Sequence, residues 1–478
     1  MESIWRKTCQ IEGRPQLAEN ISADVAVIGG GMAGLLIAWQ LQQAGQKTVV
    51  LEAGRIAGGQ TQNTTAKITA QHGMLCDALL KAKGKEKAKK YFQANQRALE
   101  EYRRIILQEG IPCDFQETAS YVYSQNLEKL QAEEKAAKKL DIAAELVEQV
   151  PLPVPHAGAV RFAGQAQFHP LKFVKALSSW LTIYEHTPVK KVERDRVVTP
   201  GGTVAAPKII FASHYPFINF PGLYFARMHQ QRSYVLALEE TPPLAGMYIG
   251  EGKNAYSFRQ YGKYLLLGGG GHRTGEEVLG GGLEGLRKAA GQFFPDSREA
   301  ACWAAQDCMP ADRIPYIGRY SSGEPNWFVA TGFQKWGMTS AMAASMILRD
   351  MICGLGNPYE EIFSPERFSA GELPQILRDG AEAAKGLAKR VFQLPEKNVR
   401  ELGAECGQLV EFEGKKRGAY RKETGELFLV NPRCPHMGCQ LAWNSQEKTW
   451  DCPCHGSRFD YRGNLLDGPA QEGIGCEK

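Results

Sequence analysis

The sequence contains no long hydrophobic run. Nothing in its 478 residues approaches the roughly 20 uninterrupted apolar residues that a membrane-spanning helix needs. The N-terminal residues Met-Glu-Ser-Ile-Trp-Arg-Lys also lack the apolar core of a secretory signal peptide. We therefore expect a cytoplasmic protein without a membrane span.

The chain also lacks a large charge of one sign. Its formal net charge is +5, and it has no concentrated basic block. The lysine-rich residues 81–90 are interspersed with alanine and one glutamate, which is typical of a solvated helix face. A nucleic-acid partner is therefore not expected. The ordinary composition indicates a globular enzyme, and the length predicts about two to four domains.

Cysteine is sparse until residue 434. Seven of the 12 cysteines are scattered singly before that point, whereas four fall between Cys434 and Cys454. Residues 434–439 read Cys-Pro-His-Met-Gly-Cys, and residues 452–457 read Cys-Pro-Cys-His-Gly-Ser. Each loop offers one thiolate and one imidazole. Together the loops can hold a two-iron cluster, with two thiolates on one iron and two imidazoles on the other, or a tetrahedral zinc ion.

These loops resemble those of Rieske [2Fe–2S] domains at almost every position, and the Gly468-Pro-Ala sequence that follows continues the likeness. The resemblance implies an all-β Rieske domain over residues 398–478. It also implies a disulfide that joins Cys439 to Cys454. The iron ligands implied by the resemblance are Cys434, His436, Cys452 and His455.

The same resemblance predicts the redox character of the cluster. Ser457 matches the hydroxyl donor of the family, but Phe459 stands where a tyrosine often provides a second hydrogen bond. Because such hydrogen bonds raise the potential, we expect an intermediate or low value for a Rieske centre. The sequence stops eight residues after Ala470, where Rieske domains usually add a strand. The last edge of the sheet is therefore expected to be missing or poorly ordered.

A nucleotide-binding pattern lies near the N-terminus. The apolar residues 24–28 predict a strand, and Gly29-Gly-Gly-Met-Ala-Gly34 follows before a predicted helix over residues 35–44. A second predicted strand, residues 48–51, ends at Glu52. This is a Rossmann arrangement: three glycines allow the turn, the approach of a pyrophosphate and the helix packing, and the acid accepts hydrogen bonds from ribose hydroxyls. The pattern alone does not separate FAD from NAD.

Further segments resemble the D-amino acid oxidase/glycine oxidase superfamily of FAD-dependent oxidoreductases. They are Glu52-Ala-Gly-Arg55, Ile209-Ile-Phe-Ala-Ser-His214, Asp312-Arg-Ile-Pro-Tyr-Ile-Gly318 and Thr331-Gly-Phe-Gln-Lys-Trp-Gly-Met-Thr339. The likeness covers residues 20–350, and it is greatest to bacterial proteins that fuse this module to a Rieske domain. It implies that FAD contacts Gly29, Gly31, Met32, Ala33, Gly34, Glu52, Ala53, Arg55, Lys67, Ala212, Gly332, Gly337, Met338 and Thr339. Without the resemblance, Lys67 is equally well read as a solvated loop lysine.

A second nucleotide site is not supported. Gly268-Gly-Gly-Gly271 follows the apolar residues 264–267, but Arg273 stands where the third glycine should be. No apolar helix or later acid follows, so we expect a strand that ends in a flexible turn. An NAD domain is therefore not predicted.

The resemblance implies an α/β fold with a Rossmann-like FAD-binding domain and an inserted antiparallel-sheet substrate domain. The FAD domain is placed at residues 20–84, 190–219 and 306–353, and the substrate domain at 85–189 and 220–305. Helices are expected over 81–108 and 127–146, and strands over 234–238 and 264–267. Residues 371–397 are expected to form a helical linker. Arg227, Arg232 and Arg273 are candidates to bind a substrate carboxylate, beside Lys67 as a fourth candidate catalytic residue.

The resemblance implies an FAD-dependent dehydrogenase that oxidises an amine or amino-acid-like substrate. Electrons would pass one at a time through its own Rieske cluster to an external carrier protein, with His436 and His455 at an exposed tip as the exit or entry point. Three alternatives remain open: a ferredoxin-reductase-like protein, a redox sensor without turnover, and a Rieske oxygenase. The last is disfavoured because nine histidines include no closely spaced pair for a mononuclear iron.

Overall fold

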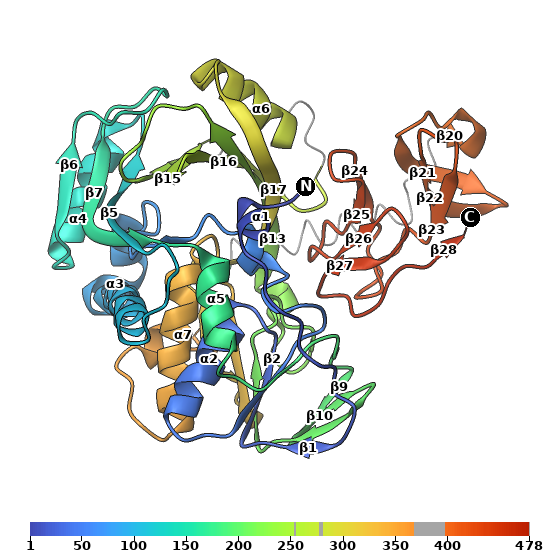
Figure 1. The fold of residues 1–478 in the computed structure, drawn as a ribbon, viewed down its shortest axis with the longest axis horizontal. Coiled ribbons are helices and arrows are strands. Elements are labelled where there is room, and N and C mark those ends of the chain that lie inside the picture. The colour runs from blue at the N-terminus through green and yellow to red at the C-terminus, as the bar shows by residue number, and fades with distance from the viewer. Residues whose placement is uncertain (253–254, 277–280, 368–396, 478) are drawn as a thin grey trace.

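Two bodies make up the chain, a large N-terminal one and a smaller all-β one at the C-terminus (Figure 1). This computed structural model describes residues 1–252, 255–276, 281–367 and 397–477. The predicted helical linker, residues 371–397, lies outside the described residues except for its last residue. Among the described helices, none combines the length and apolarity that crossing a membrane requires.

A parallel sheet forms the frame of the FAD module, in the order β18-β19-β12-β2-β3-β8. The residues of β2 and β3 are all buried, as expected for a sheet covered by helices. The strands are β2 (Val25–Ile28), β3 (Thr48–Leu51), β8 (Ile183–Tyr184), β12 (Lys208–Phe211), β18 (Tyr316–Ser321) and β19 (Glu324–Thr331), of which only β18 is antiparallel. β8 belongs to this sheet. The substrate domain predicted over residues 85–189 therefore extends at least one strand too far, because residues 183–184 lie in the sheet of the FAD module.

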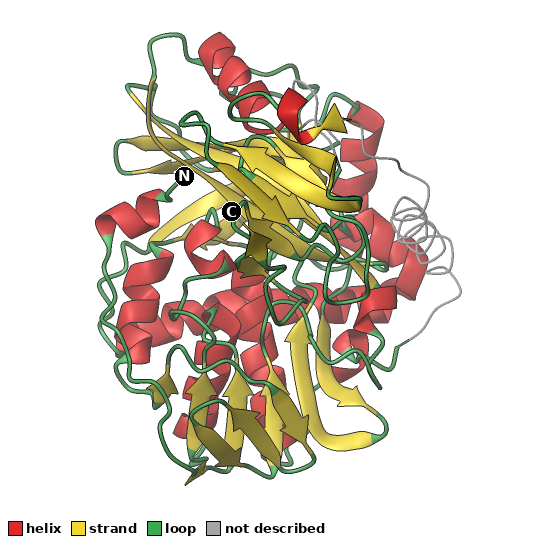
Figure 2. Ribbon diagram, turned by 90° about the vertical axis from the view of Figure 1, so that its right-hand side faces the viewer, coloured by secondary structure: helices red, strands yellow, loops and turns green. Residues whose placement is uncertain are grey.

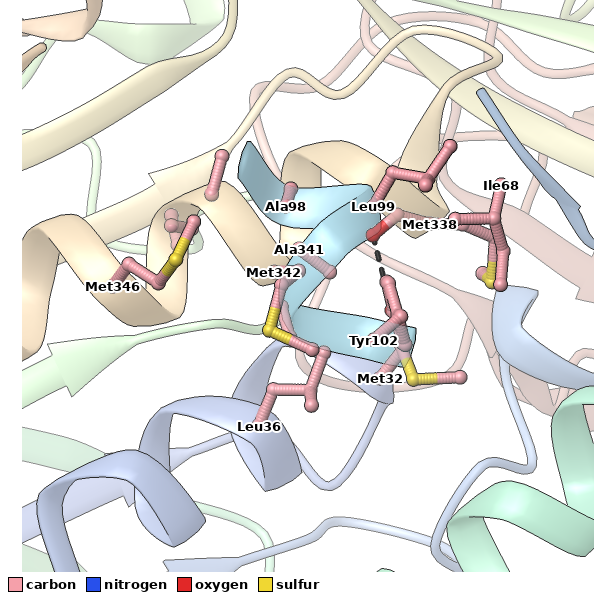
Figure 3. Close-up of a cluster of buried hydrophobic side chains, with 14 of the residues drawn as sticks. Met32, Leu36, Ile68, Ala98, Leu99, Tyr102, Met338, Ala341, Met342 and Met346 are labelled. Atoms are coloured by element: carbon pink, nitrogen blue, oxygen red, sulfur yellow. Dashed lines mark hydrogen bonds between the residues drawn. The ribbon is translucent and has the colours of Figure 1, made fainter. Parts of the chain in front are cut away.

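Three helices pack together beside this sheet: α2 (Met32–Gln43), α3 (Cys76–Gln108) and α7 (Gly337–Ile352). Leu36, Leu99 and Met342, one from each helix, meet in an apolar cluster and are fully buried (Figure 3). Burial of such a side chain contributes about 1.5–3 kcal/mol. The Tyr102 hydroxyl donates to the Met338 carbonyl oxygen at 3.1 Å and ties α3 to the first turn of α7.

A second, mixed sheet stands above the FAD module in the order β17-β13-β16-β15-β14-β5-β7-β4, with β6 beside β7 (Figure 2). Its strands are β4 (Lys67–Ile68), β5 (Gln116–Tyr123), β6 (Ala144–Val147), β7 (Ala159–Gln167), β13 (Met228–Glu239), β14 (Met247–Gly250), β15 (Ser257–Tyr261), β16 (Tyr264–Arg273) and β17 (Arg298–Pro310). The strands predicted over 234–238 and 264–267 are confirmed.

Two local predictions in this region are wrong. The predicted turn at 268–271 instead lies within β16, because Gly268 and Gly269 pair with β13 and the pairing resumes at His272 after an irregularity. Gly270 has a φ of 66°, and a Cβ there would lie 2.6 Å from the Gly282 carbonyl oxygen, so crowding explains the glycine there. The helix predicted over 127–146 ends early: α4 spans Leu127–Lys139, Asp141 has a φ of 61°, and β6 follows.

Shorter elements complete the N-terminal body. They are α1 (Ile4–Thr8), α5 (Pro170–Ser178), α6 (Gly282–Phe293), α8 (Glu360–Phe363) and a small sheet of β1 (Ile21–Ser22), β9 (Lys191–Glu193), β10 (Arg196–Thr199) and β11 (Gly202–Ala205). The buried Trp5 of α1 donates its indole N–H to the Thr64 carbonyl oxygen at 2.7 Å, which fixes the loop before β4.

The C-terminal body consists of two small sheets. One contains β20 (Lys397–Asn398), β21 (Gly407–Phe412), β22 (Lys415–Arg421), β23 (Leu427–Val430) and β28 (Cys476–Glu477), and the other β24 (Ala442–Asn444), β25 (Thr449–Asp451), β26 (Arg458–Asp460) and β27 (Leu465–Asp467). The expectation of a missing last edge is wrong, because β28 pairs with β23. The predicted all-β fold is confirmed.

Candidate functional site

The glycine loop between β2 and α2 is packed too closely for side chains. Gly29 has a φ of 111°, and a Cβ there would lie 2.6 Å from the Ala212 carbonyl oxygen. A Cβ at Gly34 would lie 1.9 Å from the Gly29 carbonyl oxygen. Gly31 precedes α2 without a side-chain cap, so the first helical amides remain available to an anion, apart from the Met32 N–H that donates to Thr61. The loop therefore fits a dinucleotide.

Glu52 supports this loop from the end of β3. One carboxylate oxygen accepts from the Gly30 N–H at 2.7 Å, and the other accepts from the Gly54 N–H at 2.8 Å. Burial raises the pKa of Glu52, and these amide hydrogen bonds oppose the increase. Each carboxylate oxygen can accept a further hydrogen bond, so the predicted ribose contact remains possible chemically and stays a prediction. Arg55 is held beside this acid by Glu185 at 2.9 Å.

One cavity of about 1230 Å³ extends from the glycine loop to the C-terminal body. Residues 465–471 of the Rieske region line it together with the FAD module. The predicted FAD contacts that line it are Gly29, Gly31, Met32, Ala33, Glu52, Ala53, Arg55, Lys67, Ala212, Gly332, Gly337 and Met338. Gly34 and Thr339 are not part of this lining. Gly34 instead packs on Gly29, and the Thr339 hydroxyl lies 2.9 Å from His72 Nε2.

Among the charged side chains that line the cavity, Lys67, Asp307, Lys335 and the exposed Lys190 have no hydrogen-bond or ion-pair partner among the described residues. Burial, aided by Arg259, lowers the pKa of Lys67 to about 7. Burial raises the pKa of Asp307 to about 6, although Lys335 and Arg232 oppose this shift. The cavity therefore offers polar groups of both signs to a ligand. Sequence reasoning missed Asp307, and it quoted Lys335 within a motif without giving it a role.

The three candidate arginines do not line the cavity. Arg232 is 3% exposed and forms a bidentate ion pair with Glu447 of the Rieske region. Arg227 lies over the ring of Tyr316, 4.3 Å from its centroid. Arg273 donates to the Pro453 carbonyl oxygen at 3.4 Å. As a correction to the sequence prediction, their guanidinium groups serve other contacts, and none lies where it was expected to bind a substrate carboxylate.

The two Cys/His loops meet at the edge of the Rieske region. The rings of His436 and His455 lie 4.9 Å apart, and the sulfurs of Cys434 and Cys452 are in hydrogen-bond contact. Both histidine Nδ1 atoms are buried without a partner among the described residues. Burial lowers the pKa of His436 to about 4 and that of His455 to about 3, which keeps both rings neutral. Two thiols and two neutral imidazoles with open Nδ1 atoms fit a Rieske cluster.

The surroundings of the loops also fit this cluster. Cys439 and Cys454 form a disulfide that joins the loops. Their sulfurs lie within 4.8 Å of Cys452, but the disulfide removes them as ligands for a separate metal ion. Ser457 contacts the thiol of Cys434 and accepts from the Ala470 N–H at 3.0 Å. Phe459 is fully buried and has no hydroxyl to donate, so the intermediate or low potential stays a prediction.

The histidine edge of the Rieske region faces the FAD module. His436 Nε2 lies 2.7 Å from Asn219 Oδ1. His455 is only 5% exposed and packs edge-on against Phe225. This corrects the expectation of an exposed tip, because the N-terminal body covers His455 and contacts His436. The sequence has no local signal for this docking, since Asn219 and Phe225 are distant from the motifs along the chain.

Comparisons with known proteins agree with both halves of this site. The model of the FAD dependent oxidoreductase family (DAO) matches residues 24–351, and that of the Rieske [2Fe-2S] domain matches residues 393–476. The chain therefore belongs to the FAD dependent oxidoreductase family and carries a C-terminal Rieske domain. It is 38% identical to YhfW of Bacillus subtilis (strain 168), which is named as a Rieske 2Fe-2S iron-sulfur protein, over 98% of this chain and 96% of that protein.

Solved structures share the fold of the larger body. Glycine oxidase from Geobacillus kaustophilus superposes with a TM-score of 0.61 at 19% identity, covering 73% of this chain and 100% of that one. L-proline dehydrogenase from P. horikoshii gives 0.59 at 17% identity, covering 74% and 98%. These likenesses show the fold alone. The predicted class, an FAD-dependent oxidoreductase with FAD and a Rieske [2Fe–2S] cluster as cofactors, is confirmed by the family matches. The alternative of a zinc ion in the Cys/His loops is therefore wrong.

Proposed function

We propose that this protein is a dehydrogenase that oxidises an amine or amino-acid-like substrate and delivers the electrons through its own Rieske cluster to an external one-electron carrier protein. One observation carries the proposal: the cavity lined by the glycine loop is also lined by Rieske residues 465–471. A cavity lined by both redox domains suits electron transfer between them. We place this activity in the cytoplasm.

The cofactors divide the chemistry by electron number: FAD supplies a two-electron oxidation and the Rieske cluster a one-electron transfer. The residues of the chain have the task of binding and deprotonating the substrate. In our proposal, Lys335 pairs with a substrate carboxylate, which a lysine does as a point charge. Lys67 takes a proton from the substrate ammonium, since a lysine with a pKa of about 7 is suited to act as a base near neutral pH. Asp307 then faces the substrate nitrogen.

We rank the dehydrogenase above an oxidase for a physical reason. An oxidase returns both electrons to oxygen at the flavin, so a docked cluster would have no part in turnover. The arrangement of Asn219 against His436, 2.7 Å apart, and the buried His455 favour a cluster that receives electrons from the FAD module.

The test is an anaerobic panel of amines and amino acids mixed with the holoprotein, read at the flavin and the cluster absorption bands. We expect at least one zwitterionic substrate to bleach the flavin first and the cluster afterwards. Bleaching of the flavin without the cluster would contradict the relay. Reduction by NADH, with no response to the panel, would favour a reductase instead.

A further inference from the structure

Two buried glutamines lie between the substrate sheet and the cluster-binding loop of the Rieske domain. Gln230 lies on β13 and Gln306 on the adjacent β17, and they are 2% and 0% exposed. A buried amide is costly unless its donors and acceptor are paired. The hydrogen-bond partners of these two side chains therefore show which parts of the molecule they fix in place.

Each amide is fully paired. The Gln230 amide nitrogen donates to the carbonyl oxygens of His455 at 2.6 Å and Gly468 at 3.1 Å. The Gln306 amide nitrogen donates to Gln230 Oε1 at 2.7 Å and to the Gly456 carbonyl oxygen at 2.9 Å. Gln306 Oε1 accepts from the Thr274 hydroxyl at 3.1 Å. Exchanging the oxygen and nitrogen of either amide would place its oxygen against a carbonyl oxygen of the Rieske domain. The network therefore specifies a single docked arrangement.

The backbones around this pair are unusually close. Gly456 has a φ of 80°, and a Cβ there would lie 2.7 Å from Gln230 Cβ. On the other side, Gly275 has a φ of 80°, and its Cβ would lie 2.6 Å from the Pro453 nitrogen. Each domain therefore lacks a side chain where the other approaches, which lets the loop between the iron ligands Cys452 and His455 rest directly on the substrate sheet.

The pair also reaches the cavity wall. Gly468, whose carbonyl oxygen accepts from Gln230, lines the cavity. His214 lines the cavity as well and lies near Gln230. Burial lowers the pKa of His214, and Asp467 and Gln230 oppose that shift. Two hydrogen bonds through one side chain therefore join a cavity-lining residue to the backbone of an iron ligand.

We propose that Gln230 and Gln306 form a clasp that holds the cluster at the flavin cavity, so that electrons enter the cluster in the docked arrangement without release of the Rieske domain. The inference rests on the proposed function for its electron source. Each transfer moves one electron from the reduced flavin to the oxidised cluster. Two transfers follow each two-electron oxidation, and a one-electron carrier reoxidises the cluster between them. Gln230 and Gln306 are positioning residues in this scheme.

The test uses the holoprotein with Gln230→Met, which keeps the side-chain length and removes every hydrogen bond of the amide. The flavin is reduced by light with EDTA as electron donor under anaerobic conditions, and the cluster band is followed afterwards. We expect the rate of flavin photoreduction to stay unchanged and the rate of cluster reduction to fall about tenfold, because buried carbonyl oxygens lose their donors. The electron paramagnetic resonance spin count after dithionite should equal that of the native protein.

Gln446→Met is the matched control. Gln446 also joins the two bodies, accepting from the Leu283 N–H at 2.7 Å and donating to Gly281, but it contacts neither cluster loop. We expect its cluster to be reduced at the native rate. Equal slowing in both variants, or native kinetics in Gln230→Met, would overturn the proposal.

A second variant guards against loss of the cluster. Gln306→Met leaves the bond from Gln230 to His455 in place, and we expect a smaller slowing with full iron content. If both clasp variants lack iron, the proposal is wrong, because the pair then serves assembly of the cluster and not its docking. Photoreduction needs no amine, so these results are independent of the substrate panel.

Discussion

Charged side chains are arranged in opposite ways in two neighbouring regions of the molecule. In the cavity, Lys67, Asp307 and Lys335 have no ion-pair partner among the described residues. At the domain interface, Glu447 pairs with both Arg232 and Arg458, and Arg458 also meets Asp451 at 3.0 Å. The charges of this interface group are all paired, whereas these three charges in the cavity are available to a ligand.

This difference separates structural charges from functional ones. A buried ion pair holds its partners in one geometry, while an unpaired charge in a cavity is free to pair with a ligand. Arg232 looked like a substrate ligand in the sequence, but its pairing places it with the structural group. Lys335 has no ion-pair partner among the described residues, and our proposal therefore gives it a role in binding substrate.

The largest effect is expected at the saturated interface. Glu447→Gln removes the central carboxylate, whose pKa the two arginines lower to about 2, and leaves Arg232 buried without its main partner. We expect the free energy of unfolding of the Rieske domain to fall by about 3–5 kcal/mol. Denaturant titration followed at the cluster band measures it. Glu251→Gln, which removes an exposed ion pair with Lys129 at 2.8 Å, should cost about 1 kcal/mol or less.

In the cavity, the largest effect is expected for Lys67→Met. The rate of flavin reduction by a saturating substrate should fall about 100-fold, because the substrate ammonium loses its base. Stability should not fall, since the ammonium of Lys67 is desolvated in the native cavity. Lys263→Met, at an exposed ion pair with Glu239, is the control. A variant that loses stability and keeps its rate would place Lys67 in the structural group.

The pH dependence of the same rate gives a smaller effect. Lys67 must be neutral to accept a proton, so the rate should rise about tenfold per unit below its pKa of about 7 and level off above it. The same residue makes stability rise with pH between about 7 and its ordinary value of 10.5, because the unfolded chain binds the proton more tightly there. Both trends should vanish in Lys67→Met.

The smallest effect concerns substrate binding. Lys335→Met should weaken binding of a substrate carboxylate about tenfold, since one charge-assisted contact is lost. An analogue that lacks the carboxylate should bind native protein and variant alike, as measured by flavin difference spectra. Arg232→Met should leave the affinities for the substrate and for the analogue unchanged. Weaker binding of the substrate in this variant would show that Arg232 contributes to substrate binding.

The parts of the molecule that the sequence predicts well are contiguous. The glycine loop with its flanking strands and the two Cys/His loops each carry their chemistry within about 30 residues, the length of one supersecondary unit. The docking of the domains has no such signal. Gln230, Gln306 and Asn219 become neighbours of the cluster only through strand pairing and domain contact. The glycines of β16 show the converse, since a local turn signal is overridden by crowding within a sheet.

The pair Gly275 and Gly456 has a consequence for related chains that fuse the same two domains. Any side chain larger than hydrogen at either position would push the Rieske domain away from the substrate sheet and lengthen the electron path. Under our proposal, a relative that keeps both glycines transfers electrons within a fixed, docked arrangement. A relative that replaces them would need a Rieske domain that moves, and the residues at these two positions would distinguish the two cases.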